Sequence, residues 1–427
     1  MTAAPRMVQS SALETEVLRD PAALLRLRGE WSALCEMAEA GCLFLTPEWL
    51  IPWFEHFGAG RELCCIAVRE EESLLGFLPL FTEVTRIAGV RVRRVAFLGD
   101  GATGCDYLDM LVAPGRESEV RTALLEALGE LSWDVCDLDG LWRESATAHF
   151  LAQRFPTRRG VSSAMAGLGG PSAQVLRDAR LRFVCPHIPL TGTYEDFLLG
   201  LGRRENLRRR EKWLHRQPGV SIELARTPEE SRLAVERFLD LHRARWSVEG
   251  GSDGLSDDRH EAFHRVAVQT LAERGWLRLY TLFAARRAVA SVYGVVHKQR
   301  FLYYQSGYDP AWRSKSVGLV LLARTVQDAY GEGLAEFDFL RGDEGYKAEW
   351  ARAERWTIQM RLWRGTVGKA ARTAHNAAVF ARESIKAAIP AEALEAARRA
   401  RRLARAQRPR GIGAVLAALR SMFDGTA

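Results

Sequence analysis

Phe301-Leu-Tyr-Tyr-Gln-Ser-Gly-Tyr308 and Phe337-Asp-Phe-Leu340 are the two stretches that decide the fold. Both are short and rich in aromatic and apolar residues, which is typical of strands in a sheet. Residues 317–330 lie between them and carry apolar residues at helical spacing. A strand, a helix and a further strand in this order indicate an α/β fold with mixed, twisted sheets flanked by helices.

The same order occurs about two hundred residues earlier. We predict strands at residues 91–98 and 107–112, a helix at 116–131 and a strand at 133–138. Matching patterns at a fixed separation indicate a duplicated domain. Further helices are expected at residues 21–40, 47–57, 194–201, 206–215, 228–246 and 260–274, and further strands at 63–68, 74–81, 220–224, 277–284 and 288–297.

The length of 427 residues predicts two domains and an appendage. We place the first domain at residues 1–165, the second at 166–363 and a basic helical tail at 364–427, with a linker near 155–180. The tail holds 13 Lys or Arg and 4 Asp or Glu, whereas the rest of the chain holds 47 and 49. The net charge of +7 is therefore a property of the tail.

The seven cysteines are scattered and have no CxxC spacing, so we expect reduced structural thiols and no metal site. No apolar run has the length of a signal peptide or a membrane span. A cytoplasmic location is the expectation. The tail is expected to be a solvated helix; a weak membrane-surface contact and a dock for an acyl carrier protein are its alternatives. Binding to DNA is not expected.

The quoted strands and their surroundings resemble a known family. Phe301 to Trp312, Gly318, and Phe337-Asp-Phe-Leu-Arg-Gly-Asp-Glu-Gly-Tyr-Lys-Ala-Glu-Trp350 closely resemble the CelD/BcsL-type acetyltransferases of the GNAT superfamily. The resemblance implies two GNAT-like domains in tandem, an arrangement shared with the Fem-type aminoacyl transferases. It also implies an acyl-CoA donor, acetyl or longer, and direct attack of a nucleophile on its thioester.

The resemblance places the donor at the helix that begins near Val317. Free amides at a helix start favour an anion, and Gly318 would let phosphates approach closely. GNAT enzymes usually carry the pattern Q/R-x-x-G-x-G/A here, whereas this chain keeps one glycine, so CoA, a carrier protein and aminoacyl-tRNA all remain open as donors. The expected donor-binding residues are Arg313, Ser314, Lys315, Ser316, Val317, Gly318 and, in the first strand, Gln305. An ordinary capped helix is the alternative.

The catalytic candidates lie in and after the second strand. Asp338 interrupts an apolar strand, so its carboxylate is either a general base or paired with a partner such as Lys347 or His242. The resemblance gives Tyr346 the task of protonating the leaving thiolate. Asp343 and Lys347 would bind substrate, or would form a polar turn with a solvated lysine. A bulge at Ser306-Gly307 would free backbone amides for the thioester carbonyl.

Further residues are expected around the acceptor. His242 and Trp246 share a helix face, where His242 would be an alternative base or an ordinary core histidine. The basic run around Arg203, Asn206 and Arg209 would bind phosphates, or would be a solvated face. Asp106 and Tyr107 match the family's pattern in the first domain, which we expect to shape the acceptor cleft.

The sequence thus predicts an N-acyltransferase that moves an acyl group from acyl-CoA to an amine or hydroxyl of an amino sugar, a polysaccharide precursor or a related metabolite. A Fem-like transferase that uses charged tRNA is the rival enzyme. A non-catalytic scaffold with a degenerate donor site is the rival from another class.

Overall fold

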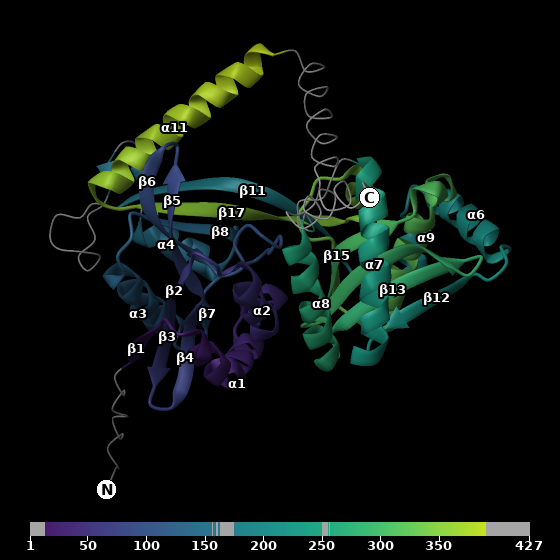
Figure 1. Cartoon of the computed structure of the whole chain (residues 1–427), viewed down its shortest axis with the longest axis horizontal. Helices are drawn as coiled ribbons and strands as arrows, with labels where there is room; N and C mark the ends of the chain where they lie inside the picture. The colour runs from purple at the N-terminus through teal and green to yellow at the C-terminus, as the bar shows by residue number, and fades with distance from the viewer. Residues whose placement is uncertain are drawn as a thin grey trace, which may run out of the picture.

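The computed structural model describes residues 13–155, 157–158, 161–162, 175–249, 255 and 257–389. Two α/β units lie side by side, and long strands run from one to the other (Figure 1). The first unit contains β1 Glu14–Leu18, α1 Pro21–Met37, α2 Pro47–Phe57, β2 Glu62–Leu63, β3 Cys65–Glu70, β4 Ser73–Leu78, β5 Leu80–Ile87, β6 Val90–Phe97, β7 Leu111–Val112, α3 Glu117–Glu130, β8 Val135–Trp142, α4 Ala146–Arg154, β9 Thr157–Arg158 and β10 Val161–Ser162.

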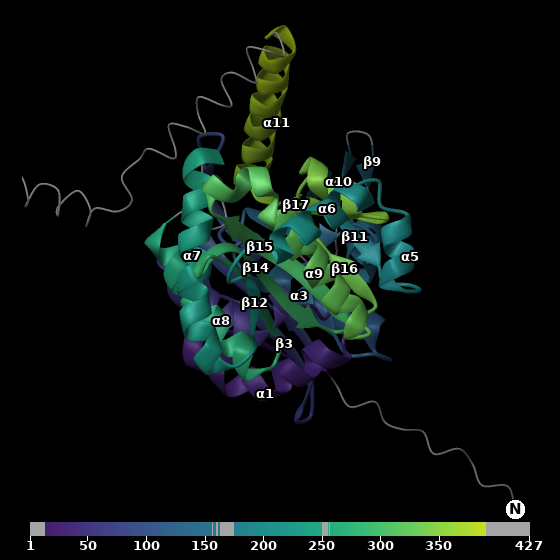
Figure 2. The ribbon, with the colours of Figure 1, turned by 90° about the vertical axis from the view of Figure 1, so that its right-hand side faces the viewer.

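The second unit follows the long strand β11 Leu176–Pro189. Helices cover both faces of its sheet, with α7 and α8 on one side and α9 and α6 on the other (Figure 2). It contains α5 Tyr194–Leu199, α6 Arg204–His215, β12 Ser221–Ala225, α7 Pro228–Glu249, α8 Asp258–Glu273, β13 Leu277–Ala284, β14 Arg287–His297, β15 Arg300–Tyr308, the 3-10 helix η2 Pro310–Lys315, α9 Val317–Gly331, β16 Glu336–Asp338, α10 Gly345–Trp350 and β17 Ala353–Trp363; α11 Gly365–Ala388 comes last.

One mixed sheet joins the two units, in the order β12-β13-β14-β15-β16-β11-β17-β8-β6-β5-β2. Both units contain the strand, helix and strand of the expected repeat, β6-α3-β8 and β15-α9-β16. Each continues with a helix and a long strand that were not predicted, α4 and β11 in the first unit and α10 and β17 in the second. The long strands are exchanged. β11 follows the first unit but pairs with β16, whereas β17 follows the second unit but pairs with β8 of the first. The boundary expected at residue 165 therefore does not separate two self-contained sheets.

Several sequence expectations need correction. The strand expected at 74–81 is divided into β4 and β5, because Pro79 has no amide hydrogen for the sheet. Thr46 occupies the N-cap position of α2, but its hydroxyl donates to the Leu43 carbonyl instead of capping the helix. The expected linker contains the start of β11, and β1 and α4 were not predicted. The helical tail expected at 364–427 begins with α11, and its residues from 390 onward lie outside the described residues.

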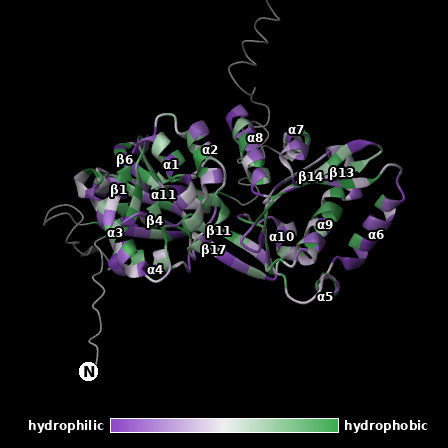
Figure 3. Cartoon of the chain, turned by 90° about the horizontal axis from the view of Figure 1, so that it is seen from below, coloured by the Kyte–Doolittle hydropathy of each residue, from purple (hydrophilic) through white to green (hydrophobic). Residues whose placement is uncertain are grey.

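The interface between the units is part of the hydrophobic core. Trp49 of α2 lies 5.1 Å from the ring of Phe263 in α8 and 5.3 Å from that of Tyr304 in β15, all fully or nearly fully buried. The apolar residues gather between the layers of both units (Figure 3). Such burial holds the two units together as firmly as a domain core. All seven cysteines are buried and unpaired, as expected.

Candidate active site

A cleft of about 600 Å³ opens where two parallel strands separate. β15 and β16 pair only from Arg300 to Leu302 and from Glu336 to Asp338. Beyond these pairs the strands diverge, and Tyr303–Ser306 and the segment after β16 form two walls of the cleft.

The first unit supplies the opposite walls in a corresponding way. β6 and β8 are parallel and pair from Arg94 to Ala96 and from Val135 to Asp137. Past that point, the loop 100–105 and Asp139-Gly140 line the same cleft. The openings between the parallel strands of both units therefore merge. The lining residues are Asp100, Gly101, Ala102, Thr103, Gly104, Cys105, Leu108, Asp139, Gly140, Arg182, Phe183, Arg245, Trp246, Tyr303, Tyr304, Gln305, Ser306, Leu340, Arg341, Glu344, Tyr346 and Lys347.

β15 has its irregularity earlier than predicted. Tyr293 of β14 faces Gln305, while the next residue, Gly294, faces Tyr303, so Tyr304 is the extra residue of a bulge. The bulge expected at Ser306-Gly307 is therefore wrong by two residues. Glycine is needed at position 307 for a different reason. A side chain there would meet the backbone of His242, so glycine lets α7 lie directly on the strand.

Asp338 is fully buried and points away from the cleft. Its Oδ2 accepts a hydrogen bond from the Tyr107 hydroxyl at 2.8 Å and faces Arg355 Nη1 at 3.4 Å. Its Oδ1 accepts the Leu340 amide at 2.7 Å. Burial raises the pKa of Asp338 to about 7, and Arg355 acts in the opposite direction. The partners expected for Asp338, Lys347 or His242, are replaced by Tyr107, which was expected at the acceptor cleft, and by Arg355, which the sequence did not indicate.

Asp106 and Tyr107 belong to the first unit and form hydrogen bonds with residues of the second. Both are buried, and Asp106 accepts from Arg341 through the amide at 2.9 Å and Nε at 2.7 Å. Tyr107 has a φ of +61° and Leu340 a φ of +55°, conformations that cost energy in residues other than glycine. Both of these strained residues donate a hydrogen bond to Asp338, Tyr107 through its hydroxyl and Leu340 through its amide. The segment after Leu340 then runs along the cleft.

The segment after β16 places its polar residues at the cleft wall. Lys347 is buried, and its Nζ donates to the Arg341 carbonyl at 2.7 Å and lies 2.9 Å from Glu344 Oε2. Asp343 is exposed and does not line the cleft. Lys347 thus fixes the shape of this segment and leaves Glu344 and Tyr346 at the opening.

Tyr346 lies at the cleft, where Tyr303 and Ser306 line the same wall. Arg245 Nη1 donates to Ser306 Oγ at 2.9 Å. Burial and the neighbouring Tyr303 raise the pKa of Tyr346, so the phenol keeps its proton at neutral pH. A protonated hydroxyl at this position can donate to a leaving group.

His242 and Trp246 have different surroundings although they share a helix face. His242 is buried between α7 and β15 and does not line the cleft. Trp246 does line it, and the guanidinium of Arg245 lies 4.9 Å from its ring centroid. The cleft therefore has an aromatic wall, but neither His242 nor Asp338 reaches it.

The start of α9 lies beyond the end of β15. Ser316 stands where the pattern Q/R-x-x-G-x-G/A has its first glycine, and it has the glycine-like φ of +58°. Space around Gly318 is open, and Val317 begins the helix. Arg313, Ser314 and Lys315 are exposed in η2. These residues, unlike Gln305, are not part of the cleft wall itself.

The basic run at the start of the second unit lies outside the cleft. Arg203 pairs with Glu349 at 2.6 Å, and Asn206 Oδ1 accepts from Arg209 at 3.4 Å. The three residues were expected to bind an acceptor, but none of them lines the cleft. They lie on and beside α6, which packs against α9.

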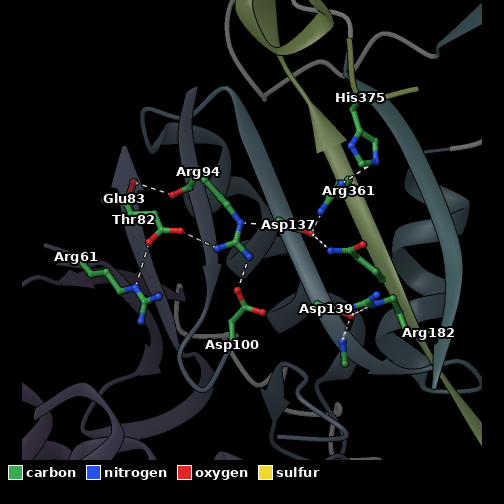
Figure 4. Close-up of polar contacts among 12 residues, drawn as sticks. Arg61, Thr82, Glu83, Arg94, Asp100, Asp137, Asp139, Arg182, Arg361 and His375 are labelled. Carbon is green, nitrogen blue, oxygen red and sulfur yellow. Dashed lines mark hydrogen bonds and ion pairs between the residues drawn. The ribbon is translucent and has the colours of Figure 1, made fainter. Parts of the chain in front are cut away.

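Sequence reasoning missed most of the charged residues on the side of the first unit. Asp139 accepts from Arg182 Nη2 at 2.8 Å, and Arg94 joins Asp100, Asp137 and Glu83 (Figure 4). The network continues from Asp137 to Arg361 and from there to His375. Asp137 and Asp139 share one face of an otherwise apolar strand, and this alternation was the signal available in the sequence.

Two classes of feature are missing from the described part of the chain. It contains no cluster of three or more His, Cys, Asp or Glu side chains that could hold a metal ion. It also contains no helix with the length and apolar character needed to cross a bilayer.

Comparisons with known proteins agree with this architecture. Residues 202–348 match the family model described as "Acetyltransferase (GNAT) domain". FemX has a similar structure, with a TM-score of 0.53 and 11% identity over 82% of this chain and 96% of that one. A protein of unknown function from Bacteroides thetaiotaomicron has a TM-score of 0.48 and 12% identity, over 82% of this chain and 100% of that one.

A third solved structure is the C-terminal domain of a putative lysylphosphatidylglycerol synthetase from Agrobacterium fabrum. It gives a TM-score of 0.48 and 9% identity over 84% of this chain and 97% of that one. No curated protein sequence matches the chain. Residues 202–348 thus match a GNAT acetyltransferase domain, and the described fold has a tandem arrangement of GNAT-like units.

Proposed function

We propose that the protein transfers an acyl group from a thioester, acyl-CoA or its equivalent, to an amine of a polar acceptor in the merged cleft. The observation that carries the proposal is the cleft itself. It opens between β15 and β16 of the GNAT-type domain, and Tyr346 stands at its wall. The first unit closes the opposite side, so donor and acceptor would meet between the units.

The polar character of the cleft supports an acceptor with many hydroxyl or charged groups. Charged pairs alternate around it, among them Asp139 with Arg182 and Lys347 with Glu344, and Trp246 adds an aromatic wall. An amino sugar or a polysaccharide precursor has the hydroxyl groups and the apolar ring face for such walls. A short acyl group suits the cleft better than a fatty chain, because charged side chains lie among its apolar ones: Asp100, Asp139, Arg182, Arg245, Arg341, Glu344 and Lys347.

In the reaction we propose, the acceptor nitrogen attacks the thioester carbonyl and the carbon–sulfur bond breaks. The sulfur takes the proton of Tyr346, and water in the open cleft takes the proton of the amine and restores that of the phenol. The amide freed at the Tyr304 bulge is the candidate donor to the carbonyl oxygen as charge develops. Asp338 and His242 take no direct part, since neither lines the cleft.

The donor class is tested by thermal unfolding with CoA, acetyl-CoA and palmitoyl-CoA. A ligand at 100 times its Kd adds about 2.7 kcal/mol to the free energy of unfolding. We expect the shift with acetyl-CoA to disappear in Gly318→Glu, because the added carboxylate would repel phosphates at the start of α9. Space is open there, so the fold tolerates the change.

Gly331→Glu is the matched control, because it makes the same change in open space at the other end of α9. It should keep the shift. An absence of any shift with CoA or its esters, or an equal loss in both variants, would contradict a CoA donor bound at this helix.

A further inference from the structure

Helix α6 has a strongly basic face that the cleft does not use. Arg208 and Arg209 are followed by Lys212 and Arg216 at intervals of three or four residues, so the four lie on one side of the helix, and all are exposed. The opposite side buries Leu207 and Leu214. Figure 3 shows α6 as a largely hydrophilic helix at the outer edge of the second unit.

Two further cations extend this face toward the donor helix. Lys315 of η2 lies 4.9 Å from the ring centroid of Trp213 in α6, and Arg313 is exposed beside it in the chain. α6 also packs against α9, whose first residue follows directly on η2 and Ser316. We call Arg208, Arg209, Lys212, Arg216, Arg313 and Lys315 the basic surface; Glu205 is the acidic residue on the same side of α6.

We propose that the basic surface docks an acidic carrier protein, one that presents the acyl group as a thioester on a phosphopantetheine arm. The inference rests on the proposed function, because it names the source of the thioester for the same cleft. The surface adjoins the start of α9, where the phosphate of the arm would bind. From there the strand β15 leads back through Ser306 to the cleft.

The extent of the basic surface favours a protein over a free nucleotide. Arg208 and Arg216 are eight residues apart, which is about 12 Å along a helix axis. One acidic helix laid along α6 would meet four of the cations, and the attraction would also steer the encounter. The two cations of η2 lie nearest to α9 and would remain for the phosphate of the arm.

The surroundings of Trp213 at this surface disfavour RNA. Bases of nucleic acids bind proteins largely by stacking on free aromatic faces. Trp213 is partly buried, and Lys315 covers its ring. The described part of the basic surface thus offers charge without a stacking platform, which suits acidic side chains better.

The test measures the binding of a fluorescently labelled acyl carrier protein, carrying phosphopantetheine but no acyl group, by anisotropy. The full chain is compared with Arg208→Glu/Arg209→Glu and with Arg26→Glu/Arg232→Glu, which reverses two exposed arginines on α1 and α7. We expect Kd to rise at least about tenfold in the first double variant and less than about twofold in the control. Thermal unfolding verifies that each variant is folded.

Other outcomes would overturn the inference. These are equal affinity of both variants for the carrier, no binding to the full chain at low salt, or displacement of the carrier by a structured RNA at lower concentration. A loss of CoA binding in Arg208→Glu/Arg209→Glu without any carrier binding would make the surface a nucleotide site instead. The carrier is titrated without an acyl group, so failure of acyl transfer would leave this measurement unaffected.

Discussion

The two units repeat one order of elements, but the helices α3 and α9, which hold equivalent places in that order, begin differently. In the first unit, the Glu117 carboxylate accepts the Gly115 amide at 3.0 Å at the start of α3, and this backbone hydrogen bond lowers the pKa of Glu117. In the second unit, the first turn of α9 has no acidic residue, and Gly318 leaves space. A helix start attracts anions. The first unit supplies its own anion, whereas the first turn of α9 supplies none, and there we propose that the phosphates of the donor bind.

This difference teaches how a duplicated fold can divide its work. The proposed donor site needs a helix start without acids, and only α9 of this pair provides it. The first unit keeps the diverging strands but uses them as walls, with Asp100 and Asp139 at the cleft. We therefore propose one donor site and one shared cleft for the two units.

The largest effect is expected from separating the units. Residues 1–165 lack β17, which pairs along β8, so this fragment should show no cooperative unfolding transition. Co-expression with residues 166–427 should restore a complex that melts like the full chain. Circular dichroism during heating measures both. A fragment 1–165 that melts cooperatively by itself would show that the strand exchange is dispensable.

A second large effect concerns Tyr346. Tyr346→Phe removes the proton donor but keeps the ring, so kcat/KM should fall about a hundredfold, the lower range for general acid catalysis. Tyr330→Phe changes an equivalent hydroxyl on α9, whose ring lies against Phe197 and away from the cleft. It should retain activity within about twofold. A loss smaller than about threefold in Tyr346→Phe would remove Tyr346 from the proposed mechanism.

A third prediction contrasts one buried carboxylate of each unit. The pKa of Asp338 is raised to about 7, mainly by burial, so its contribution to stability is complete at pH below about 4 and falls as the pH rises toward 7. Burial would also raise the pKa of Asp137, but Arg94 and Arg361 together lower it. Its contribution is present at neutral pH and is lost in acid.

Asp338→Asn and Asp137→Asn should consequently change Tm with opposite dependence on pH. The Tm of Asp338→Asn should improve relative to wild type between pH 5 and 8. The deficit of Asp137→Asn should be largest at neutral pH and shrink below about pH 4. Scanning calorimetry across this range checks both. Parallel pH profiles of the two variants would refute the contrast.

The smallest effect is expected at the start of α3. Glu117→Gln removes the carboxylate from the helix start and should lower Tm by no more than about 2–4 °C. It should not create a response to acetyl-CoA, because the loop before α3 has no counterpart of η2. Glu126→Gln, exposed in the middle of the same helix, is the control and should leave Tm unchanged. A new shift of Tm with acetyl-CoA in Glu117→Gln would mean that a single carboxylate accounts for the difference in donor binding between the two units.

Local patterns explain which parts of the fold the sequence predicted. The strand 277–284 agrees with β13, and helix 317–330 agrees with α9 to within one residue. These elements are determined by alternation or helical spacing within a few residues. The 14-residue β11 was missed, since its neighbours β16 and β17 lie some 150–180 residues further along the chain.

The candidate site shows the same limit. Leu340, Tyr346 and Lys347 follow one strand, so a single motif indicated this wall of the cleft. Arg182, Arg245 and the loop 100–105 join it only through the strand exchange and the packing of α7. The contact between Tyr107 and Asp338 joins residues 231 positions apart, and the pattern of neither segment specifies the other.

The exchanged strands also impose an order on synthesis. β8 ends at Trp142, and its partner β17 begins at Ala353, about 210 residues later. At about 5–20 residues per second, the ribosome needs about 10–40 s to supply that partner. During this interval the nascent first unit has an unpaired edge at β8, which is a template for wrong pairing. The growing chain must therefore survive an incomplete state that the finished protein never visits.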